Sequence, residues 1–432
     1  MDKVSRDEKK KKVDKNKKNR KRKKSKLRNF FKKIFPIFDM KDNYSFSEVF
    51  IITIVSLVLG IFASFSIVAI FVNGRNIFKM SRELGRFYDA YSVLVDNYYG
   101  DIDKKQLIDD AIYGMVSSVD DTYTSYVDND NTSDFDEMVS GIYEGIGCTI
   151  LQIDDSIKIH EVYKDGPSDK AGLKKGDIIK SVDEMIASEV TVNELSDYIK
   201  HSNISKIQMV VIRDDTELTL TIVRDKVEIP SVSTKVYDKN NKKIGYMSIS
   251  IFSSVSDVQF KEKLGELEKE NIDGLIIDVR NNNGGYLSSV SEILSSLLPK
   301  GNVIYQVEKN KDKNIVKDKT NEKRDYPIAV LTNMNSASAS EILAASIKES
   351  YHGFVVGTKT YGKGTVQQVK RLSDGSMIKY TVENWLTPKG NWINKVGVEP
   401  THMVELTEEY LKNPGDDTDR QLQKALELVS SN

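Results

Sequence analysis

The hydrophobic pattern changes several times along the chain, and its first feature is a uniformly apolar run. The 24 residues Val49–Val72 (VFIITIVSLVLGIFASFSIVAIFV) include no charged side chain. As a helix they would span about 36 Å, and the hydrocarbon core of a bilayer is about 30 Å thick. The run therefore predicts an uncleaved transmembrane helix, because core helices and the apolar regions of signal peptides are shorter.

Two amphipathic patterns follow. In 76–98 and in 104–119, apolar or aromatic residues recur every three or four positions, which predicts two helices. Neither segment holds a constellation of catalytic side chains. We expect this helical region to pack on the main body or on a partner chain.

The period then shortens to two, which predicts strands. Alternating residues occur in 157–162, 178–182, 207–212 and 218–223, and helical patterns lie at 168–171 and 192–201. Together they predict a small compact domain that ends near Pro230.

From Lys243 onward, apolar strands alternate with helices. Strand patterns lie at 243–250, 274–280, 326–333 and 353–360, separated by helical patterns at 255–270, 286–297 and 335–349. The charged segment 309–324 interrupts this order and is expected to be exposed. The alternation predicts a partly parallel sheet covered on its faces, with a last helix at 417–429.

Charge is distributed unevenly along the chain. Residues 1–43 hold 19 Lys/Arg and 6 Asp/Glu, and the remainder holds 44 basic and 58 acidic residues, although the overall formal charge is −1. Basic residues before an apolar span predict a cytoplasmic N-terminus, which leaves the acidic bulk outside the membrane. We interpret the basic tail as an orientation signal near anionic lipid, not as a nucleic-acid site.

The chain has one cysteine, Cys148, and four histidines, so the usual redox and basic side chains are scarce. A single cysteine excludes an intramolecular disulfide and argues against a Cys-rich metal site. No metal or cofactor is expected. None of the four, His160, His201, His352 and His402, stands in a glycine-rich or acid-paired context, and we interpret them as structural or exposed residues.

Three loops after predicted buried strands carry unusual polar residues. They are RNNNGGY (280–286), NSASASEI (335–342) and TKTYGKGTVQQ (358–368). The carboxyl ends of parallel strands meet at one edge of a sheet, where functional loops gather. The three loops are therefore expected to form one site.

The serines of NSASASEI stand where a helix begins. A serine there is most often an N-cap, but the N–H groups and the positive dipole end of a helix also stabilise an oxyanion. The candidate base is Lys363, which stands between Gly362 and Gly364. A lysine acts as a base only if burial lowers its pKa from about 10.4 to roughly 7–8. The residues alone leave both the capping role and the nucleophilic role open.

Several motifs in this order resemble the carboxyl-terminal processing proteases, which are serine peptidases with a Ser–Lys dyad and an embedded PDZ domain. The resemblance covers about 78–429. It rests on GMVSSVDDTYTSY (114–126), GIGCTI (145–150), GPSDKAGLKKGDIIKSVDE (166–184), RDKVEIPSV (224–232), DVRNNNGGYL (278–287), NSASASEIL (335–343), YGKGTVQ (361–367) and LTPKG (386–390).

The resemblance implies an α/β protease core with an inserted PDZ domain, β-rich with two helices, preceded by a helical N-terminal region. The hydropathy and charge patterns add one transmembrane helix and a basic tail before it. The expected parts are a basic cytoplasmic tail (1–46), a transmembrane anchor (47–72), the helical region (73–140), the PDZ domain (141–226), the serine protease core (227–405) and a C-terminal helical segment (406–432).

The resemblance also implies the catalytic residues. Ser338 is the nucleophile, Lys363 is the general base 25 positions later, and Gln367 orients the lysine. Ser336 and Ser340 are then a turn residue and a cap or core hydroxyl.

Two further features of the catalytic site follow from the resemblance. The N–H of Ala339 forms half of the oxyanion hole, and the N–H of Gly284 or Gly285 forms the other half. Glu349 stands eleven positions after the nucleophile, where the family commonly has aspartate. Its role as a supporting acid is left open.

In the PDZ segment, the loop Gly145–Cys148 is implied to bind the substrate tail. The N–H groups of Ile146, Gly147 and Cys148 would hold the terminal carboxylate, while the peptide adds a strand to the edge of the domain. The helix at 192–201 would form the second wall of this groove. Cys148 would be a small buried residue, not a redox group.

The implied protein is a membrane-anchored, extracytoplasmic serine endopeptidase that recognises accessible C-terminal tails and cleaves through an acyl-enzyme. Its expected partners are protein or peptide substrates, the cytoplasmic membrane and a second copy of the chain, but not nucleic acid. Three alternatives remain: a catalytically silent PDZ scaffold, a Ser–His hydrolase that uses His352, and a protease that is silent until a tail moves the PDZ domain.

Overall fold

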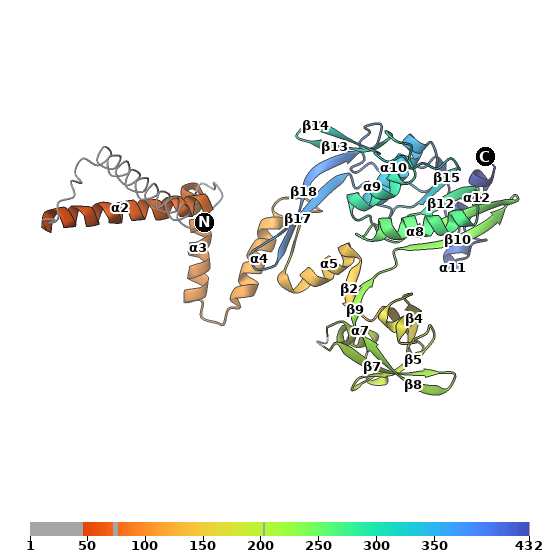
Figure 1. Ribbon diagram of the computed structural model, residues 1–432, viewed down its shortest axis with the longest axis horizontal. Helices are drawn as coiled ribbons and strands as arrows, with labels where there is room; N and C mark the ends of the chain where they lie inside the picture. The colour runs from red at the N-terminus through yellow and green to blue at the C-terminus, as the bar shows by residue number, and fades with distance from the viewer. Residues whose placement is uncertain (1–45, 72–76, 202–203, 432) are drawn as a thin grey trace, which may run out of the picture. The chain divides into compact units, whose positions relative to one another are not determined.

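The computed structural model describes residues 46–71, 77–201 and 204–431 (Figure 1). The chain falls into two compact units, 1–104 and 105–432. The basic tail predicted at 1–46 lies outside the described residues except for its last residue, so its interpretation stays a prediction.

The first unit contributes two helices, α2 (Phe46–Phe71) and α3 (Ile77–Asn97). α3 confirms the amphipathic helix predicted at 76–98, and α2 confirms that the apolar run is helical. Within the described residues, no helix has both the length and the hydropathy that crossing a bilayer requires. The predicted transmembrane span is therefore not confirmed.

The second unit opens with a helical segment that is fastened to a strand. Its elements are α4 (Lys104–Ser117), β1 (Ser125–Val127), η1 (Asn129–Asn131) and α5 (Thr132–Ser140). The buried Tyr126 hydroxyl in β1 donates to Asp109 Oδ1 in α4 (2.7 Å), which holds the helix against the strand. α5 ends at Gly141, whose φ of +71° is the left-handed conformation that glycine adopts without strain.

The segment predicted to be a PDZ domain is an antiparallel sheet with a helix packed on it. The strand order is β3 (Cys148–Ile153), β4 (Ser156–Val162), β5 (Ile178–Val182), β7 (Lys206–Arg213) and β8 (Thr216–Val223), with β6 (Met185–Ile186) beside β5. The helical elements are α6 (Pro167–Lys170), η2 (Ala187–Glu189) and α7 (Val192–His201). Alternate residues of the strands, such as Ile159 and Met209, pack with Leu195 of α7. The β-rich prediction is confirmed.

A two-stranded ribbon joins this segment to the rest of the unit. β2 (Ile142–Gly145) pairs antiparallel with β9 (Asp225–Glu228), and Tyr143 lies opposite Val227. Because the chain enters along β2 and leaves along β9, the two ends of the PDZ segment lie side by side.

The next sheet has six strands, and its buried strands are parallel. The order is β10 (Val232–Lys239), β11 (Lys242–Ile249), β12 (Gly274–Asp278), β15 (Ile328–Thr332), β16 (Phe354–Gly357) and β19 (His402–Met403). Only β10 is antiparallel to its neighbour among these described strands. Every residue of β12 and β15 is buried, as a parallel sheet covered on both faces requires.

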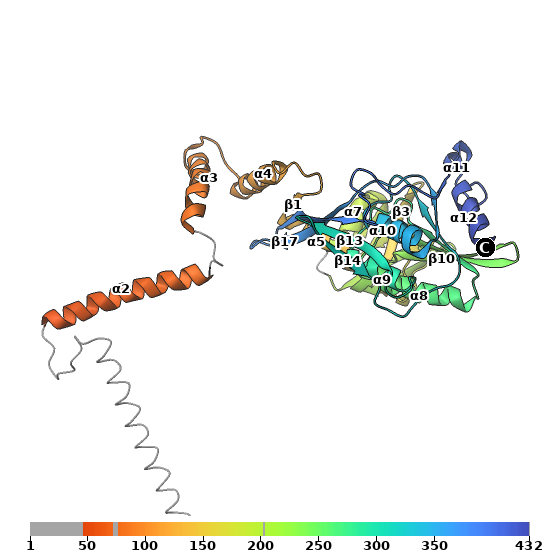
Figure 2. The ribbon, with the colours of Figure 1, turned by 90° about the horizontal axis from the view of Figure 1, so that it is seen from above.

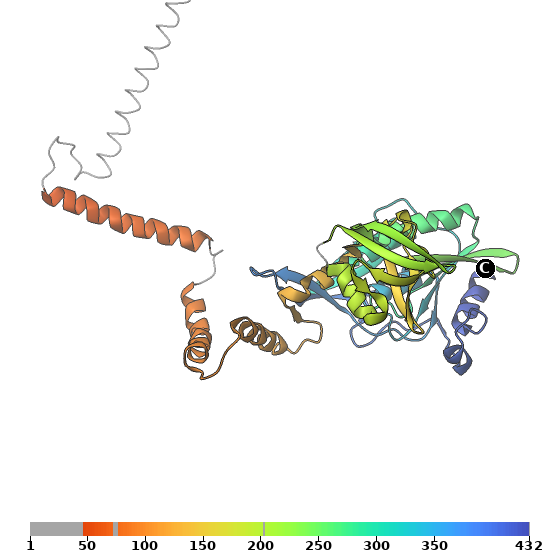
Figure 3. The same ribbon diagram turned by 90° about the horizontal axis from the view of Figure 1, so that it is seen from below.

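Helices cover both faces of this sheet. They are α8 (Ser256–Lys269), α9 (Leu287–Ser295), α10 (Ala339–Ser346) with the π-helical η3 (Ile347–Tyr351), and α12 (Arg420–Ser430). The short α11 (Glu408–Lys412) precedes α12 and has no buried residue. Leu275 and Ile277 of β12 pack with α8, α9 and α10, whereas Ile276 between them packs with α12. Figures 2 and 3 show α8 and α12 on opposite sides of the sheet.

A second sheet in the core was not predicted. It consists of β1, β18 (Met377–Leu386), β13 (Val303–Lys309) and β14 (Asp312–Lys317) in that order, with β17 (Thr365–Arg371) paired to β18. The charged segment 309–324 is largely exposed, as predicted, but part of it is strand β14. It pairs with β13 in a hairpin, and such pairing between distant positions leaves little trace in the local pattern.

Candidate active site

Three loops gather at the carboxyl edge of the parallel sheet, as predicted. β12, β15 and β16 are neighbours, and the loops after them carry Gly284 and Gly285, Ser338, and Lys363, respectively. These four residues and Gln367 line a single cavity of about 510 Å³. α5 contributes apolar side chains to the cavity wall, namely Phe135, Met138 and Val139.

Ser338 has an unusual backbone conformation. It is the N-cap residue of α10, with φ +56° and ψ −113°, and only 9% of it is exposed. A non-glycine residue pays a conformational cost at positive φ, and such residues persist only where their surroundings determine the conformation. Here the flanking Ala337 N–H donates to the Asn282 carbonyl (3.0 Å), and the Ser338 N–H donates to Glu341 (2.9 Å).

The buried Glu341 joins the serine loop to the lysine loop. Its Oε2 accepts from the backbone N–H groups of Ser338 (2.9 Å) and Lys363 (2.8 Å). Its Oε1 accepts from the Gly362 N–H (2.8 Å) and the Thr360 hydroxyl (2.5 Å). Burial raises the pKa of Glu341, and these four donors act in the opposite direction. One carboxylate therefore fixes the main chain at both positions.

Lys363 is in an environment that disfavours its charge. Burial lowers its pKa, the positive charge of Lys379 lowers it further, and Glu341 and Asp121 oppose the change. Lys379 lines the same cavity. The Lys363 ammonium lies over the Tyr123 ring, 4.7 Å from its centroid, a contact that favours the cation. The direction of the pKa change is the one that a general base needs.

Two backbone N–H groups next to the candidate nucleophile, one in each of two loops, have no hydrogen-bond acceptor among the described residues. The Gly284 N–H already donates to Asn282 Oδ1 (2.8 Å). By contrast, the N–H groups of Gly285 and Ala339 meet no acceptor among the described residues. Of the two glycines expected to complete an oxyanion hole, the geometry therefore favours Gly285.

Glycine is required at both positions for steric reasons. At Gly284, with φ +100°, a Cβ would lie 2.7 Å from the Ser338 Cβ. At Gly285, with φ +145°, it would lie 2.1 Å from the Phe252 carbonyl oxygen. The NNNGG turn thus presses its main chain against the serine turn, which side chains at these positions would prevent.

The other two serines of the motif have structural partners. The Ser336 hydroxyl donates to the Val279 carbonyl (2.8 Å), and the Ser340 hydroxyl donates to the Asn282 carbonyl (2.8 Å). Both hydroxyls tie the serine loop to the loop after β12. The expected turn role of Ser336 and core role of Ser340 agree with these contacts.

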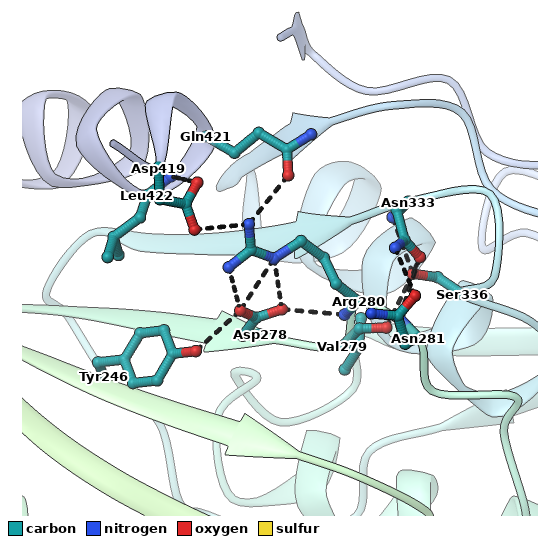
Figure 4. Close-up of polar contacts among 10 residues, drawn as sticks. All are labelled: Tyr246, Asp278, Val279, Arg280, Asn281, Asn333, Ser336, Asp419, Gln421 and Leu422. Atoms are coloured by element: carbon teal, nitrogen blue, oxygen red, sulfur yellow. Dashed lines mark hydrogen bonds and ion pairs between the residues drawn. The ribbon is translucent and has the colours of Figure 1, made fainter. Parts of the chain in front are cut away.

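A buried ionic network stabilises the start of the β12 loop (Figure 4). Arg280 pairs with Asp278 (2.6 Å) and with Asp419 (2.8 Å), and it donates to Gln421 Oε1 (3.0 Å). Tyr246 donates to the other side of this network, at Asp278 Oδ2 (2.8 Å). The network fastens the start of α12 to the strand that leads into NNNGG.

The remaining predicted residues lie in different places. Gln367 lines the cavity and donates to the hydroxyls of Thr365 (2.8 Å) and Thr381 (3.3 Å). Glu349 is not a lining residue: it accepts from the Lys389 N–H (2.8 Å) and holds the LTPKG turn. His352 is exposed at the end of η3 and does not line the cavity either.

The PDZ segment has its own cavity, of about 410 Å³. Gly145, Ile146 and Cys148 line it, and α7 forms the opposite wall, as expected. The Gly147 N–H, one of three expected carboxylate donors, donates to the Tyr143 hydroxyl (3.2 Å). Burial raises the pKa of the Cys148 thiol to about 11, so the thiol is protonated at neutral pH.

The sequence interpretation missed several residues of the site. Glu341 was detectable, because it stands three positions after Ser338, which is the capping-box spacing. Tyr123 and Lys379 had no such signal, since they reach Lys363 and the cavity from the segment before β1 and from β18, respectively.

Comparisons with known proteins agree with this architecture. Models of peptidase family S41, of the PDZ domain and of the "Activating protease CtpB N-terminal domain" match residues 243–404, 145–223 and 71–131. Carboxy-terminal processing protease CtpB of Bacillus subtilis is 37% identical over 339 residues, which cover 78% of this chain and 71% of that protein. The chain belongs to the carboxy-terminal processing proteases.

Other members of the family match in the same way. Carboxy-terminal processing protease CtpA of Bacillus subtilis is 36% identical, with 77% of this chain and 71% of that protein covered. A solved structure titled as a putative S41 protease from Bacteroides fragilis superposes with a TM-score of 0.50 at 16% identity, covers 79% of this chain and 96% of that one, and shows a shared fold. This carboxy-terminal processing protease is thus a serine-type peptidase with a PDZ domain and a helical N-terminal region.

Proposed function

We propose that the protease cleaves by a Ser338–Lys363 dyad. Neutral Lys363 takes the proton of Ser338 Oγ as that oxygen attacks the scissile carbonyl. The N–H groups of Ala339 and Gly285 stabilise the oxyanion. The lysine then returns the proton to the leaving amine, and water, deprotonated by the same lysine, hydrolyses the acyl-enzyme. Gln367 helps to orient the lysine.

One observation carries this proposal. Ser338 and Lys363 line the same cavity, and Glu341 Oε2 accepts from the backbone N–H groups of both residues. The lowered pKa of Lys363 and the exposure of His352 away from the cavity favour lysine over histidine as the base.

The nucleophile is tested with the full chain on a denatured or tail-exposed protein substrate. Ser338→Ala is expected to lower kcat by about 10⁴-fold or more, as in other acyl-transfer enzymes. Ser340→Ala, a buried hydroxyl two positions away, is expected to retain most of the activity. A serine-reactive probe should label Ser338 in the parent. If Ser338→Ala cleaves as fast as the parent, the assignment is wrong.

The base is tested with Lys363→Arg, because arginine keeps the charge but does not deprotonate. Activity should fall by about 10³-fold or more. Lys370→Arg on the exposed part of β17 and His352→Ala are the controls, and both should stay near the parent value. Retained activity in Lys363→Arg, with loss in His352→Ala, would instead identify a Ser–His hydrolase.

We further propose that the PDZ domain selects substrates by their accessible C-terminal tails. Support comes from the loop Gly145–Cys148 facing α7 across a cavity whose apolar lining includes Ile150, Val192 and Ile199. Tails with apolar last residues should therefore bind best. Binding without any cleavage or probe labelling would indicate a silent scaffold, and cleavage that begins only when a tail peptide is added would indicate a gated protease.

We also propose that the protein is anchored in the cytoplasmic membrane with its protease outside. The support is the uncharged run Val49–Val72, the preceding basic excess and the largely exposed apolar side chains of α2, such as Phe50, Leu57 and Phe62. The protein should stay with membranes after alkaline extraction, and protease added to spheroplasts should digest 105–432. Release by alkali would contradict the anchor. A homodimer stays a prediction, which sedimentation in detergent would test.

A further inference from the structure

The carboxylate-binding loop of the PDZ domain already contains an oxygen from the protein. The Gly147 N–H donates to the Tyr143 hydroxyl, with an N···O distance of 3.2 Å. Tyr143 lies on β2, outside the loop, and it lines the same cavity as Gly145, Ile146 and Cys148. The hydroxyl therefore occupies part of the site proposed for a substrate carboxylate.

The sequence provides the room for this contact. Tyr143 and Gly145 are two positions apart in a strand, so they face the same side. A Cβ at Gly145 would lie 2.2 Å from Cε2 of the Tyr143 ring. Glycine at 145 thus lets the ring lie flat across the strand, and this position brings its hydroxyl to Gly147.

A tail carboxylate and the tyrosine compete for the same hydrogen. Gly147 has φ +75°, which sets the direction of its N–H within the loop. A backbone N–H forms a stronger hydrogen bond to a carboxylate than to a neutral hydroxyl. Burial raises the pKa of Tyr143, so its hydroxyl is neutral at physiological pH and exerts no full charge on an arriving anion. Binding of the tail carboxylate to this N–H is therefore favourable, but it requires that the hydrogen bond between Gly147 and Tyr143 breaks first.

We propose that the Tyr143 hydroxyl is an internal competitor for the tail carboxylate, and that tail binding displaces it from Gly147. The inference rests on the proposed recognition of C-terminal tails. It assigns to Tyr143 a role in setting the affinity, and thus the selectivity, of the protease for its substrates.

The test is tail binding by the full chain with Tyr143→Phe, in a Ser338→Ala background so that the peptide is not consumed. Two short peptides with apolar last residues are compared, one with a free carboxylate and one with a C-terminal amide. Loss of one neutral hydrogen bond from the free state predicts about 3- to 10-fold tighter binding of the free acid. Binding of the amide should change by less than about 2-fold.

Tyr198→Phe is the matched control. Tyr198 lies in the same domain but does not line the cavity, and its hydroxyl donates to Asp183 (3.1 Å). Its substitution should leave both affinities unchanged. Unchanged or weaker acid binding by Tyr143→Phe, in a protein that prefers acid to amide, would overturn this inference alone. Equal binding of acid and amide by the parent would overturn tail recognition and the inference with it.

Discussion

The protease core and the PDZ domain each contain a glycine-containing loop that lines a cavity, and the two loops differ in which side chain accepts from a glycine N–H. In the core, Gly284 donates to the side chain of Asn282, which belongs to the same loop. In the PDZ segment, Gly147 donates to the side chain of Tyr143, which belongs to a neighbouring strand. Each loop thus satisfies one glycine N–H with an oxygen of the protein.

The difference lies in how firmly that oxygen is held. Asn282 is fully buried, its Nδ2 donates to the Ile249 carbonyl (2.8 Å), and its own carbonyl accepts from Ala337 and Ser340. Tyr143 is only half-buried. A side chain fixed by several partners acts as scaffold, whereas one held by a single neutral bond is easily exchanged. The comparison teaches that a similar contact is permanent in one loop and replaceable in the other.

The largest expected difference between the two loops appears when one methyl group is added to each. Gly285→Ala places a Cβ against the fixed Phe252 backbone and should lower kcat/KM by about 10³-fold, through loss of an oxyanion donor. In Gly145→Ala the atoms nearest to the new methyl group belong to the Tyr143 ring, which can move, so cleavage of a short tail-independent peptide should fall less than about 3-fold. Equal losses in the two variants would remove the distinction between a rigid and a replaceable loop.

Glu341→Gln tests whether the core depends on a fixed acceptor. In glutamine, an NH₂ group takes the place of one carboxylate oxygen, and this group cannot accept a hydrogen bond. If it replaces Oε2, the N–H groups of Ser338 and Lys363 lose their acceptor; if it replaces Oε1, the Gly362 N–H does. We expect kcat to fall by about 10²-fold with little change in KM, because the peptide-binding walls are untouched. Glu266→Gln on the exposed face of α8 is the matched control and should keep kcat near the parent value. An unchanged kcat would show that Glu341 stabilises the fold without positioning the dyad.

Lys379→Met should change the pH dependence of the core more than its maximum rate. The positive charge of Lys379 disfavours the cation of Lys363, so its removal raises the pKa of Lys363, while Glu341, Asp121 and Tyr123 remain. The acid limb of kcat/KM should move to higher pH by about 0.5–1 unit, a 3- to 10-fold loss at pH 7. Lys370→Met is the control. A limb that stays in place would mean that burial alone tunes the lysine.

The smallest effect on activity is expected in the ionic network at the start of the β12 loop. Asp419→Asn weakens the ion pair with Arg280 but keeps the cap on α12, where Asp419 Oδ1 accepts from the Leu422 N–H. The free energy of unfolding should fall by about 1–2 kcal/mol, which lowers Tm by about 2–4 °C. At 25 °C, kcat should stay within about 2-fold. A larger loss of activity would mean that α12 controls the NNNGG loop.

Local pattern was enough to predict much of this protein. The period of apolar residues predicted α3, α7, α8, α9 and the buried strands β12, β15 and β16, because each forms from contiguous residues with one periodicity. The order of these elements predicted a parallel sheet, and a parallel sheet brings its carboxyl-end loops together. Ser338, Lys363 and the glycine pair were therefore expected at one edge, and they line one cavity.

The tertiary structure alone decided the direction of the pKa change of Lys363 and which side chains accept from the glycine N–H groups of the two loops. Lys363 is buried, and Lys379 of β18 and Tyr123 of the segment before β1 approach it. The bonds that Glu341 accepts from Thr360, Gly362 and Lys363 also join residues that are far apart in the chain. The hydrogen bonds from Gly284 to Asn282 and from Gly147 to Tyr143 leave no trace in the hydrophobic pattern of the sequence. A sequence shows which groups can form hydrogen bonds, but which donor meets which acceptor depends on packing in three dimensions.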